Sequence, residues 1–327
     1  MTHDSKVAMT KTTPTSAAVS IRGLSKHYGD KPALDGLKLE IGKGEIFGYI
    51  GPNGAGKTTT LRILAGLLKP TSGAAHILDV DVERSPRRVK ELVGYMPDEF
   101  GVYENMTLYE YLDFFGAAFR IPRAKRRAII EDVLALTDLA PKRDDEVSAF
   151  SRGMTQRACL AKTLLHDPEV LILDEPASGL DPRARIEFRE LLKELQNMGK
   201  TILVSSHILS ELSTICTSVG ILESGVLITS GDVKTILEKV RAHRSFVIAL
   251  LHETDRDRTV ALLEQRTEVR NVERIGGAVR VSLDATEPEI AGLIQALSND
   301  EILFTEFREE HADLETAFLT LTEGRLA

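Results

Sequence analysis

A glycine-rich segment at residues 51–58 has the residue types and spacing needed to hold a phosphate group. It reads Gly-Pro-Asn-Gly-Ala-Gly-Lys-Thr, a glycine followed after four residues by Gly-Lys-Thr. Glycines allow a tight turn whose backbone N–H groups point at the phosphate, and the following helix presents its positive end there. In this pattern Lys57 reaches the β- and γ-phosphates of a nucleotide and Thr58 ligates Mg²⁺. The predicted nucleotide-binding residues here are Gly51, Pro52, Asn53, Gly54, Ala55, Gly56, Lys57, Thr58 and Thr59.

Two adjacent carboxylates follow an aliphatic run further along the chain. Asp174 and Glu175 come directly after Val170–Leu173, a run typical of a buried strand. In a doubly wound sheet, the end of such a strand lies beside the bound nucleotide. Asp174 is therefore a candidate Mg²⁺ ligand, and Glu175 is a candidate base that polarises the attacking water. Alone, the pair could be a strand end that turns into solvent, but the phosphate loop upstream favours the catalytic interpretation.

At three further positions, the residue type alone does not show whether the polar group has a structural or a catalytic role. The segment Ser151-Arg-Gly-Met154 opens an apolar helix, where it forms either an ordinary cap or an anion site. Asp181 precedes Pro182 and fits a helix N-cap. His207 follows the predicted strand Thr201–Ser205, a position where a lone histidine is more often structural than catalytic.

The elements that must position these residues predict an α/β fold. From Val19 to about Lys239, apolar strands alternate with helical stretches, as in a sheet covered by helices. Glu45–Ile50 is the strand expected to enter the phosphate loop, and Thr58–Leu68 is the helix expected to leave it. Between about residues 98 and 165 the patterns are helical and include a capping box at Thr107, which predicts a helical subdomain inserted into the core.

The pattern changes after Arg241, and the last part of the chain predicts a small separate α/β module. We expect a disordered tail at residues 1–18, a nucleotide-binding domain at 19–240 and an accessory domain at 241–327, whose role stays open between partner contact and dimer support. The module's expected strands are Ser245–Leu251, Arg270–Ile275 and Ala278–Leu283, and its expected helices lie near Arg256–Gln265, Pro288–Leu297 and Ala312–Leu321.

Composition narrows the range of partners. The chain has 327 residues and a formal charge of -8, which argues against nucleic acid as the main partner because phosphate neutralisation requires a basic face. No apolar run approaches the roughly 18 residues of a membrane span, so any membrane role is expected to lie with another chain. The two cysteines indicate a cytosolic protein with packed, reduced thiols.

The ordered set of motifs resembles the nucleotide-binding subunit of ABC transporters over about Val19–Lys239. The resemblance implies that Ser151 and Gly153 belong to the signature motif, which contacts the γ-phosphate of ATP bound to the opposite subunit. It also implies adenine stacking on Tyr28, and it makes Asp181 the D-loop aspartate and His207 the switch histidine. Two copies, or two related subunits, would enclose two ATP molecules with Mg²⁺ and drive a separate transmembrane permease from the inner face of the cell membrane.

Two departures from the family pattern stand out. The signature usually reads Leu-Ser-Gly-Gly-Gln, whereas this chain has Phe150-Ser-Arg-Gly-Met154. At the Q-loop, Asp98 and Glu99 follow Gly94-Tyr-Met-Pro97 where glutamine is usual. Asp98 is shorter than glutamine, donates no hydrogen bond when ionised and brings charge near Mg²⁺, so we include it among the metal-site candidates.

The Q-loop region and the C-terminal segment narrow the resemblance to one branch. Residues 94–107 and the segment Asp313–Thr322 are similar to the type-two exporter branch, whose ATPases serve drug, sodium, lipid or polysaccharide efflux. Alternatives are an importer subunit and a soluble ABC ATPase that acts on ribosomes or DNA. A single phosphate loop and the lack of a long heptad run between Thr58 and Ser151 disfavour the soluble class. The sequence does not identify the transported substrate.

Overall fold

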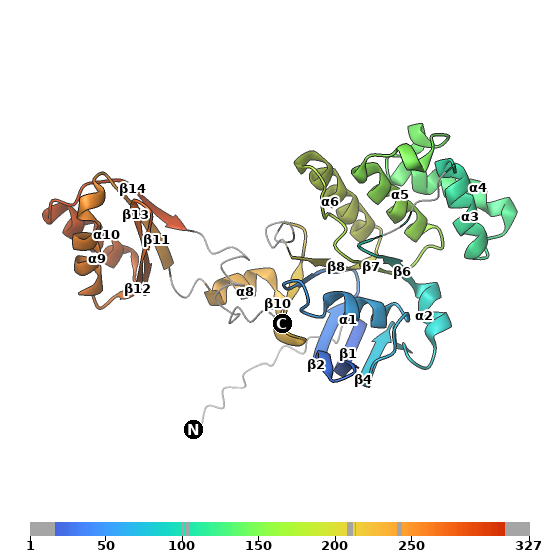
Figure 1. The fold of residues 1–327 in the computed structure, drawn as a ribbon, viewed down its shortest axis with the longest axis horizontal. Coiled ribbons are helices and arrows are strands. Elements are labelled where there is room, and N and C mark those ends of the chain that lie inside the picture. Colours follow the sequence, from blue (N-terminus) through green and yellow to red (C-terminus); the bar gives the residue numbers. More distant parts are fainter. Residues whose placement is uncertain are drawn as a thin grey trace, which may run out of the picture. The chain divides into compact units, whose positions relative to one another are not determined.

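The computed structural model describes residues 17–99, 101, 105–207, 212, 214–240 and 244–310. The described chain divides into two compact units (Figure 1), and the main division falls between Thr229 and Ser230. The first unit contains the phosphate loop and all the acidic and histidine candidates named above. The second unit takes in the C-terminal sheet and its helices, together with residues 212 and 214.

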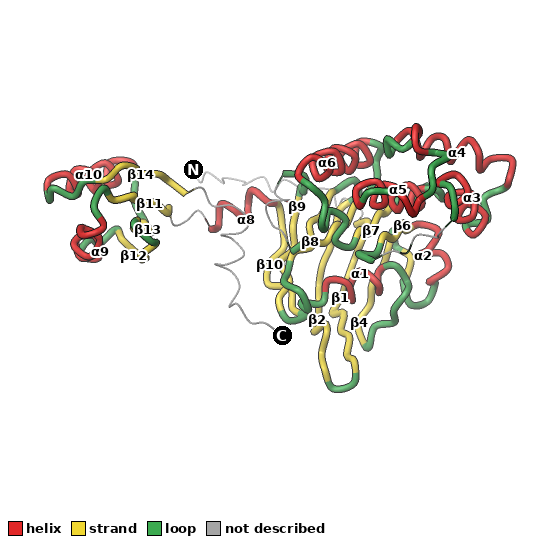
Figure 2. The backbone as a smooth tube through the Cα atoms, turned by 45° about the horizontal axis from the view of Figure 1, so that its top comes forward, coloured by secondary structure: helices red, strands yellow, loops and turns green. Residues whose placement is uncertain are grey.

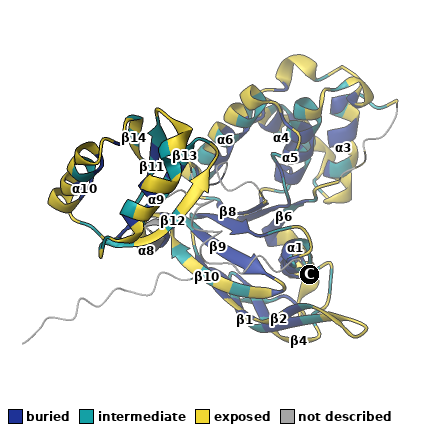
Figure 3. Ribbon diagram, turned by 60° about the vertical axis from the view of Figure 1, so that its left-hand side comes forward, coloured by how far each residue is buried: buried dark blue, intermediate teal, exposed yellow. Residues whose placement is uncertain are grey.

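A six-stranded sheet forms the centre of the first unit, with the strand order β10-β9-β3-β8-β7-β6. Strand β3 pairs in parallel with β8 and β9, and β7 pairs in parallel with β6 and β8. Every residue of β3, β7 and β8 is buried, as expected for parallel strands covered on both faces. Figure 3 shows β8 in the colour of buried residues. The strands are β3 (Ile46–Ile50), β6 (Val93–Met96), β7 (Val170–Leu173), β8 (Thr201–Ser206), β9 (Ser218–Glu223) and β10 (Val226–Asp232).

The parallel pairing places the carboxyl ends of β3, β7 and β8 at one edge of the sheet. The phosphate loop follows β3, Asp174 and Glu175 follow β7, and His207 follows β8. Three segments that are far apart in the sequence therefore meet where ligands bind in open α/β sheets.

A second, antiparallel sheet was not predicted. Its order is β2-β1-β4-β5, and its strands are β1 (Ala17–Tyr28), β2 (Lys31–Gly42), β4 (Ser72–Ile77) and β5 (Val80–Asp81). Alternate residues of β2, including Leu37, Leu39 and Ile41, are buried in the main core, so this sheet is held by one apolar face. Because β1 begins at Ala17, the predicted N-terminal tail is two residues too long; its first 16 residues lie outside the described part.

Helices cover both faces of the parallel sheet. Helix α1 (Lys57–Leu64) lies between this sheet and the antiparallel one, while α5 (Arg152–Leu164) and α6 (Pro182–Asn197) cover the other face (Figures 1 and 2). The regular structure described between β6 and β7 is helical, as predicted. Besides α5 it comprises α3 (Leu108–Ala118), α4 (Arg123–Leu136) and the short 3-10 helices Ala140–Lys142 and Val147–Ala149, and α2 (Pro86–Leu92) precedes β6.

The start of α3 confirms the predicted capping box. The Thr107 N–H donates to Glu110 Oε2 over 2.9 Å, and the Glu110 N–H donates to Thr107 Oγ1 over 3.3 Å. Two backbone donors at the helix start are therefore satisfied by the side chains of the same turn.

The second unit is a βαββαβ module with its own apolar core. Its sheet has the order β12-β13-β11-β14 with antiparallel neighbours throughout, the arrangement of ferredoxin-like folds. Strand β14 was not predicted because charged residues interrupt its apolar pattern, and the predicted helix Ala312–Leu321 lies outside the described residues. The elements are α8 (Val233–Val240), β11 (Arg244–Leu250), the 3-10 helix Glu253–Asp255, α9 (Arg256–Glu264), β12 (Val269–Ile275), β13 (Ala278–Leu283), α10 (Glu287–Asn299) and β14 (Phe304–Glu310).

A half-buried histidine joins the helical part of the first unit to its sheet. His166 Nε2 lies 3.1 Å from the Val93 carbonyl oxygen, and the imidazole stacks on Phe119 with ring centroids 4.4 Å apart. Burial lowers the pKa of His166; the hydrogen bond to Val93 and the charge of Asp167 oppose this shift, and Lys200 adds to it. The folded protein therefore binds a proton here less readily than the unfolded chain does.

We expect this histidine to make the protein less stable in mild acid. The unfolded chain takes up a proton below a pH of about 6.5, whereas the folded His166 resists it, so stability is lost as the pH falls through that range. His166→Gln keeps a donor for Val93 without a titrating group, and its Tm should fall less between pH 7.5 and pH 5.5 than that of the wild type. Thermal unfolding at both pH values measures this, and equal losses in the two proteins would contradict it.

Candidate functional site

The phosphate loop forms a compact turn between β3 and α1. The Ala55 N–H donates to the Pro52 carbonyl over 3.2 Å, and Gly56 has a φ of +103°, which favours glycine. A Cβ on Gly56 would lie 2.5 Å from the Ala33 carbonyl oxygen, so a side chain there would displace the backbone. The first turn of α1 begins directly after this glycine, and its unpaired N–H groups are suited to a phosphate.

Lys57 is folded back onto the loop that it follows. Its Nζ donates to the Gly51 carbonyl over 2.6 Å and to the Pro52 carbonyl over 3.2 Å, and it lies 3.3 Å from Glu175 Oε1. The ammonium group is buried, with 6% of the side chain exposed. A buried cation at the mouth of a phosphate loop, held by carbonyls and one carboxylate, can exchange these contacts for phosphate oxygens.

Glu175 is the centre of a chain of contacts that joins all three strand ends. Its Oε2 lies 2.8 Å from His207 Nδ1, and its backbone N–H donates to Ser205 Oγ over 3.0 Å. Glu175 has a φ of +49°, a left-handed conformation that costs a non-glycine residue roughly 1–2 kcal/mol. The structure therefore brings the predicted catalytic residues Lys57, Glu175 and His207 together around one carboxylate.

Asp174 has a free acceptor atom that fits a cation. Its side chain is buried, with Oδ1 accepting a hydrogen bond from Ser205 Oγ over 2.7 Å, while Oδ2 has no hydrogen-bond partner among the described residues. No cluster of three His, Cys, Asp or Glu in the described part of the chain could enclose a metal ion. Mg²⁺ in nucleotide sites is usually held by one or two protein groups together with phosphate oxygens, so Asp174, with Thr58 in the first turn of α1, fits that need.

Asp98 lies two residues beyond β6, at the same edge of the sheet at which Asp174 follows the neighbouring strand β7. The pKa of Asp98 is raised by burial and by the negative charges of Asp174, Glu175 and Glu99, and Arg152 opposes this shift. These interactions are consistent with an added acid close to the candidate metal site. That Asp98 contacts the metal stays a prediction.

The remaining phosphate-contact candidates lie at helix starts. Ser151 Oγ accepts a hydrogen bond from the Met154 N–H over 3.4 Å, and Asp181 Oδ1 accepts one from the Ala184 N–H over 2.9 Å. Gly153 faces α6, where an added Cβ would lie 3.4 Å from the Ala184 methyl carbon. Among the described residues, no hydrogen bond or ion pair joins Ser151, Gly153 or Asp181 to the phosphate loop.

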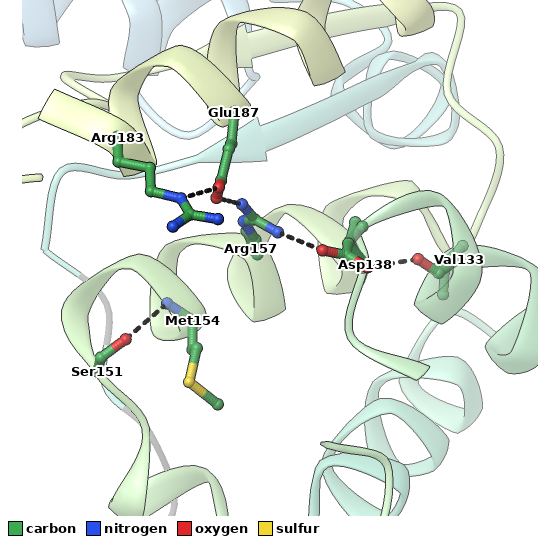
Figure 4. A network of polar contacts seen from close by, with 8 residues as sticks. Val133, Asp138, Ser151, Met154, Arg157, Arg183 and Glu187 are labelled. Carbon is green, nitrogen blue, oxygen red and sulfur yellow. Dashed lines mark hydrogen bonds and ion pairs between the residues drawn. The ribbon is translucent and has the colours of Figure 1, made fainter. Parts of the chain in front are cut away.

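Ion pairs between charged side chains join α5 and α6, the two helices that Ser151 and Asp181 cap (Figure 4). Arg157 of α5 pairs with Glu187 of α6 and, over 3.3 Å, with Asp138, which follows α4. Arg183 pairs with the same Glu187 over 3.0 Å. The two helices that present Ser151 and Asp181 are thus fixed relative to each other and to the helical part of the unit.

Tyr28, the predicted adenine-stacking residue, ends β1 and is 52% exposed. The Lys26 ammonium group lies 5.3 Å from its ring centroid. An exposed aromatic ring is available for stacking, but its use for adenine stays a prediction.

Sequence reasoning missed Ser205. Its hydroxyl donates to Asp174 and accepts the Glu175 N–H, so it orients both acidic residues. Its place at the end of an apolar strand, two residues before His207, was the available signal.

The buried parallel sheet carries a strand, a glycine-rich loop and a helix in succession, next to a strand that ends in two carboxylates. This arrangement defines a nucleoside triphosphatase with a phosphate loop. Comparison with known proteins specifies the family. The sequence model described as "ABC transporter" matches residues 34–178. The chain is 38% identical over 224 residues to Nod factor export ATP-binding protein I of Rhizobium meliloti, covering 68% of this chain and 67% of that protein.

Two further similarities cover nearly the whole of the compared proteins. The ABC transporter ATP-binding protein NatA of Bacillus subtilis is 36% identical over 229 residues, which are 68% of this chain and 93% of NatA. The solved structure of cbiO1 from Clostridium perfringens, described as part of the ABC transporter complex cbiONQ, aligns with a TM-score of 0.63 at 27% identity. It covers 69% of this chain and 95% of that one.

This chain therefore belongs to the ABC transporter family, in which it is an ATP-binding subunit with the ATPase activity of that family. The predicted fold class is confirmed as well. Among the described residues, none of the helices is both long enough and apolar enough to cross a bilayer.

Proposed function

We propose that this chain is the Mg²⁺-dependent, ATP-hydrolysing motor subunit of an exporter whose permease is a separate chain. The observation that carries the proposal is the contact chain from Lys57 through Glu175 to His207, with the open acceptor of Asp174 beside it. The exporter assignment is supported by the name of the Rhizobium relative, a Nod factor export protein, and by the resemblance of residues 94–107 to the type-two exporter branch.

The residues divide the work of hydrolysis among them. Lys57 leaves its carbonyl partners to neutralise charge on the β- and γ-phosphates, which frees Glu175 to accept a proton from the attacking water. His207, hydrogen-bonded to Glu175, orients that carboxylate and, as the switch histidine, would face the γ-phosphate of bound ATP. When bound through Asp174 and Thr58, Mg²⁺ supplies electrostatic stabilisation of the phosphates.

The proposal includes a dimer in which each ATP contacts two subunits. Ser151 and Gly153 have the character of an anion site at a helix start, yet they make no polar contact with the phosphate loop of their own chain in the described part. In the dimer, the signature segment of a second copy or of a related subunit meets the ATP held by the first, and Asp181 lies at the same interface. ATP binding closes this dimer and hydrolysis reopens it.

The dimer can be tested with a variant that binds ATP without turning it over. Light scattering of Glu175→Gln with Mg²⁺ and ATP should show a doubled mass that ADP does not produce. In parallel, wild-type ATP turnover should require Mg²⁺. If ATP left the mass unchanged, both for the chain alone and for its mixture with a related subunit, the shared site would be contradicted. ATP turnover without Mg²⁺ would contradict the metal assignment.

The proposed adenine contact gives a separate prediction. Tyr28→Ala should raise the ATP half-saturation concentration about tenfold with little change in kcat, because base–aromatic stacking contributes binding without touching the reacting atoms. Tyr28→Phe keeps the ring and is the control. Steady-state kinetics over a range of ATP concentrations measures both values. An unchanged half-saturation in Tyr28→Ala would mean that adenine binds elsewhere.

A further inference from the structure

Arg152, which stands where the family signature usually has glycine, contacts a loop on another element. It is the first residue of α5, and its Nε donates to the carbonyl oxygen of Ser178 over 2.8 Å. The neighbouring Gly179 has a φ of +69°, and a Cβ there would lie 2.6 Å from the guanidinium carbon of Arg152. The guanidinium group therefore packs directly on the backbone of the loop at residues 175–181, where glycine leaves room for it.

This loop begins at Glu175. The Ser178 N–H donates to the Glu175 carbonyl over 3.0 Å, so Ser178 joins the guanidinium of Arg152 to the backbone of Glu175. At the far end of the loop, Arg185 of α6 donates from Nε to the Leu180 carbonyl over 2.9 Å. Two arginines from two helices thus hold the carbonyls of a loop whose first residue has a strained backbone.

We propose that Arg152 is a positioning residue that ties the start of α5 to the Glu175–Asp181 loop. Through Ser178 it links the signature segment, at Ser151 and Gly153, to the backbone of Glu175. The proposal rests on the proposed function only in taking Glu175 as the base and the signature segment as a phosphate contact.

The physical link is tested without any nucleotide. Arg152→Met removes the donor and the charge while keeping a side chain of similar reach, and Arg127→Met, on the exposed face of α4, is the matched control. Hydrogen exchange of the amides of Ser178 and Leu180 should be about tenfold faster in Arg152→Met, because a charged donor on a loop carbonyl is lost. The amide of Ala184, capped by Asp181, should exchange at the wild-type rate in both variants.

The catalytic consequence is tested by steady-state kinetics. Arg152→Met should lower kcat about tenfold and leave the ATP half-saturation within about twofold, since the base is misplaced while the phosphate loop is intact. Arg152→Lys, which keeps a charged donor, should recover part of kcat. A loss that lysine does not recover, or a loss confined to ATP binding, would overturn the positioning role.

The two measurements separate this inference from the proposed function. Unchanged exchange at Ser178 in Arg152→Met would overturn the link whatever the turnover. Faster exchange with unchanged kcat would overturn its role in catalysis. Wild-type protein without ATP turnover in the presence of its permease would refute the proposed function, while the exchange experiment would still decide the link.

Discussion

Glu175→Gln is expected to keep ATP binding and to cut ATP turnover at least a hundredfold, a loss typical of removing general-base assistance. Glutamine retains the size of the side chain and can still meet Lys57 and His207, but it cannot take a proton from water. Single-turnover hydrolysis with radiolabelled ATP measures the chemical step directly, and equilibrium binding of a fluorescent ATP analogue shows that the site is intact.

The control for this variant is a glutamate of the same unit away from the sheet edge. Glu190 of α6 is exposed and pairs with Lys193 over 3.0 Å, so Glu190→Gln should hydrolyse ATP at the wild-type rate. Near-wild-type turnover in Glu175→Gln would refute the assignment of Glu175 as the base.

The second large effect is expected for the candidate metal ligand. Asp174→Asn should lower turnover about a hundredfold and raise the Mg²⁺ concentration needed for half-maximal activity, since a charged ligand becomes a neutral one. The amide oxygen can still accept the hydrogen bond from Ser205, so the strand end should keep its shape. Titration with Mg²⁺ at saturating ATP measures the shift.

Asp167 provides the comparison for this second variant. It is exposed, lies before β7 and pairs with Lys200 over 2.5 Å, so Asp167→Asn should leave the Mg²⁺ dependence unchanged. If Asp174→Asn also kept the wild-type Mg²⁺ dependence, Asp174 would not be a ligand of the metal.

The parts of the site that depend on local sequence could be predicted. The phosphate loop and the acidic strand end are contiguous motifs whose chemistry follows from residue type and spacing. The caps at Thr107, Ser151 and Asp181 are local as well, because each is made by a side chain and an N–H three residues later. Such contacts require no knowledge of the tertiary fold.

The parts that depend on pairing between distant segments could not be predicted. Ser205 orients Asp174 only because β7 and β8 are neighbours in the sheet, and the sequence does not specify that order. The contact between Arg152 and Ser178 spans 26 residues and depends on how α5 packs against the loop. The antiparallel sheet was missed for the same reason, since β1 also pairs with β4, which follows the phosphate loop.

The proposed coupling of this subunit to a separate membrane permease is tested by affinity purification of the tagged full chain from native membranes in mild detergent. We expect one polytopic membrane protein to be recovered in a fixed ratio to the chain and to raise the rate of ATP hydrolysis when the two are reconstituted together. Recovery from the soluble fraction, with ribosomes, nucleic acid or no partner, would contradict this coupling and favour a soluble ABC ATPase.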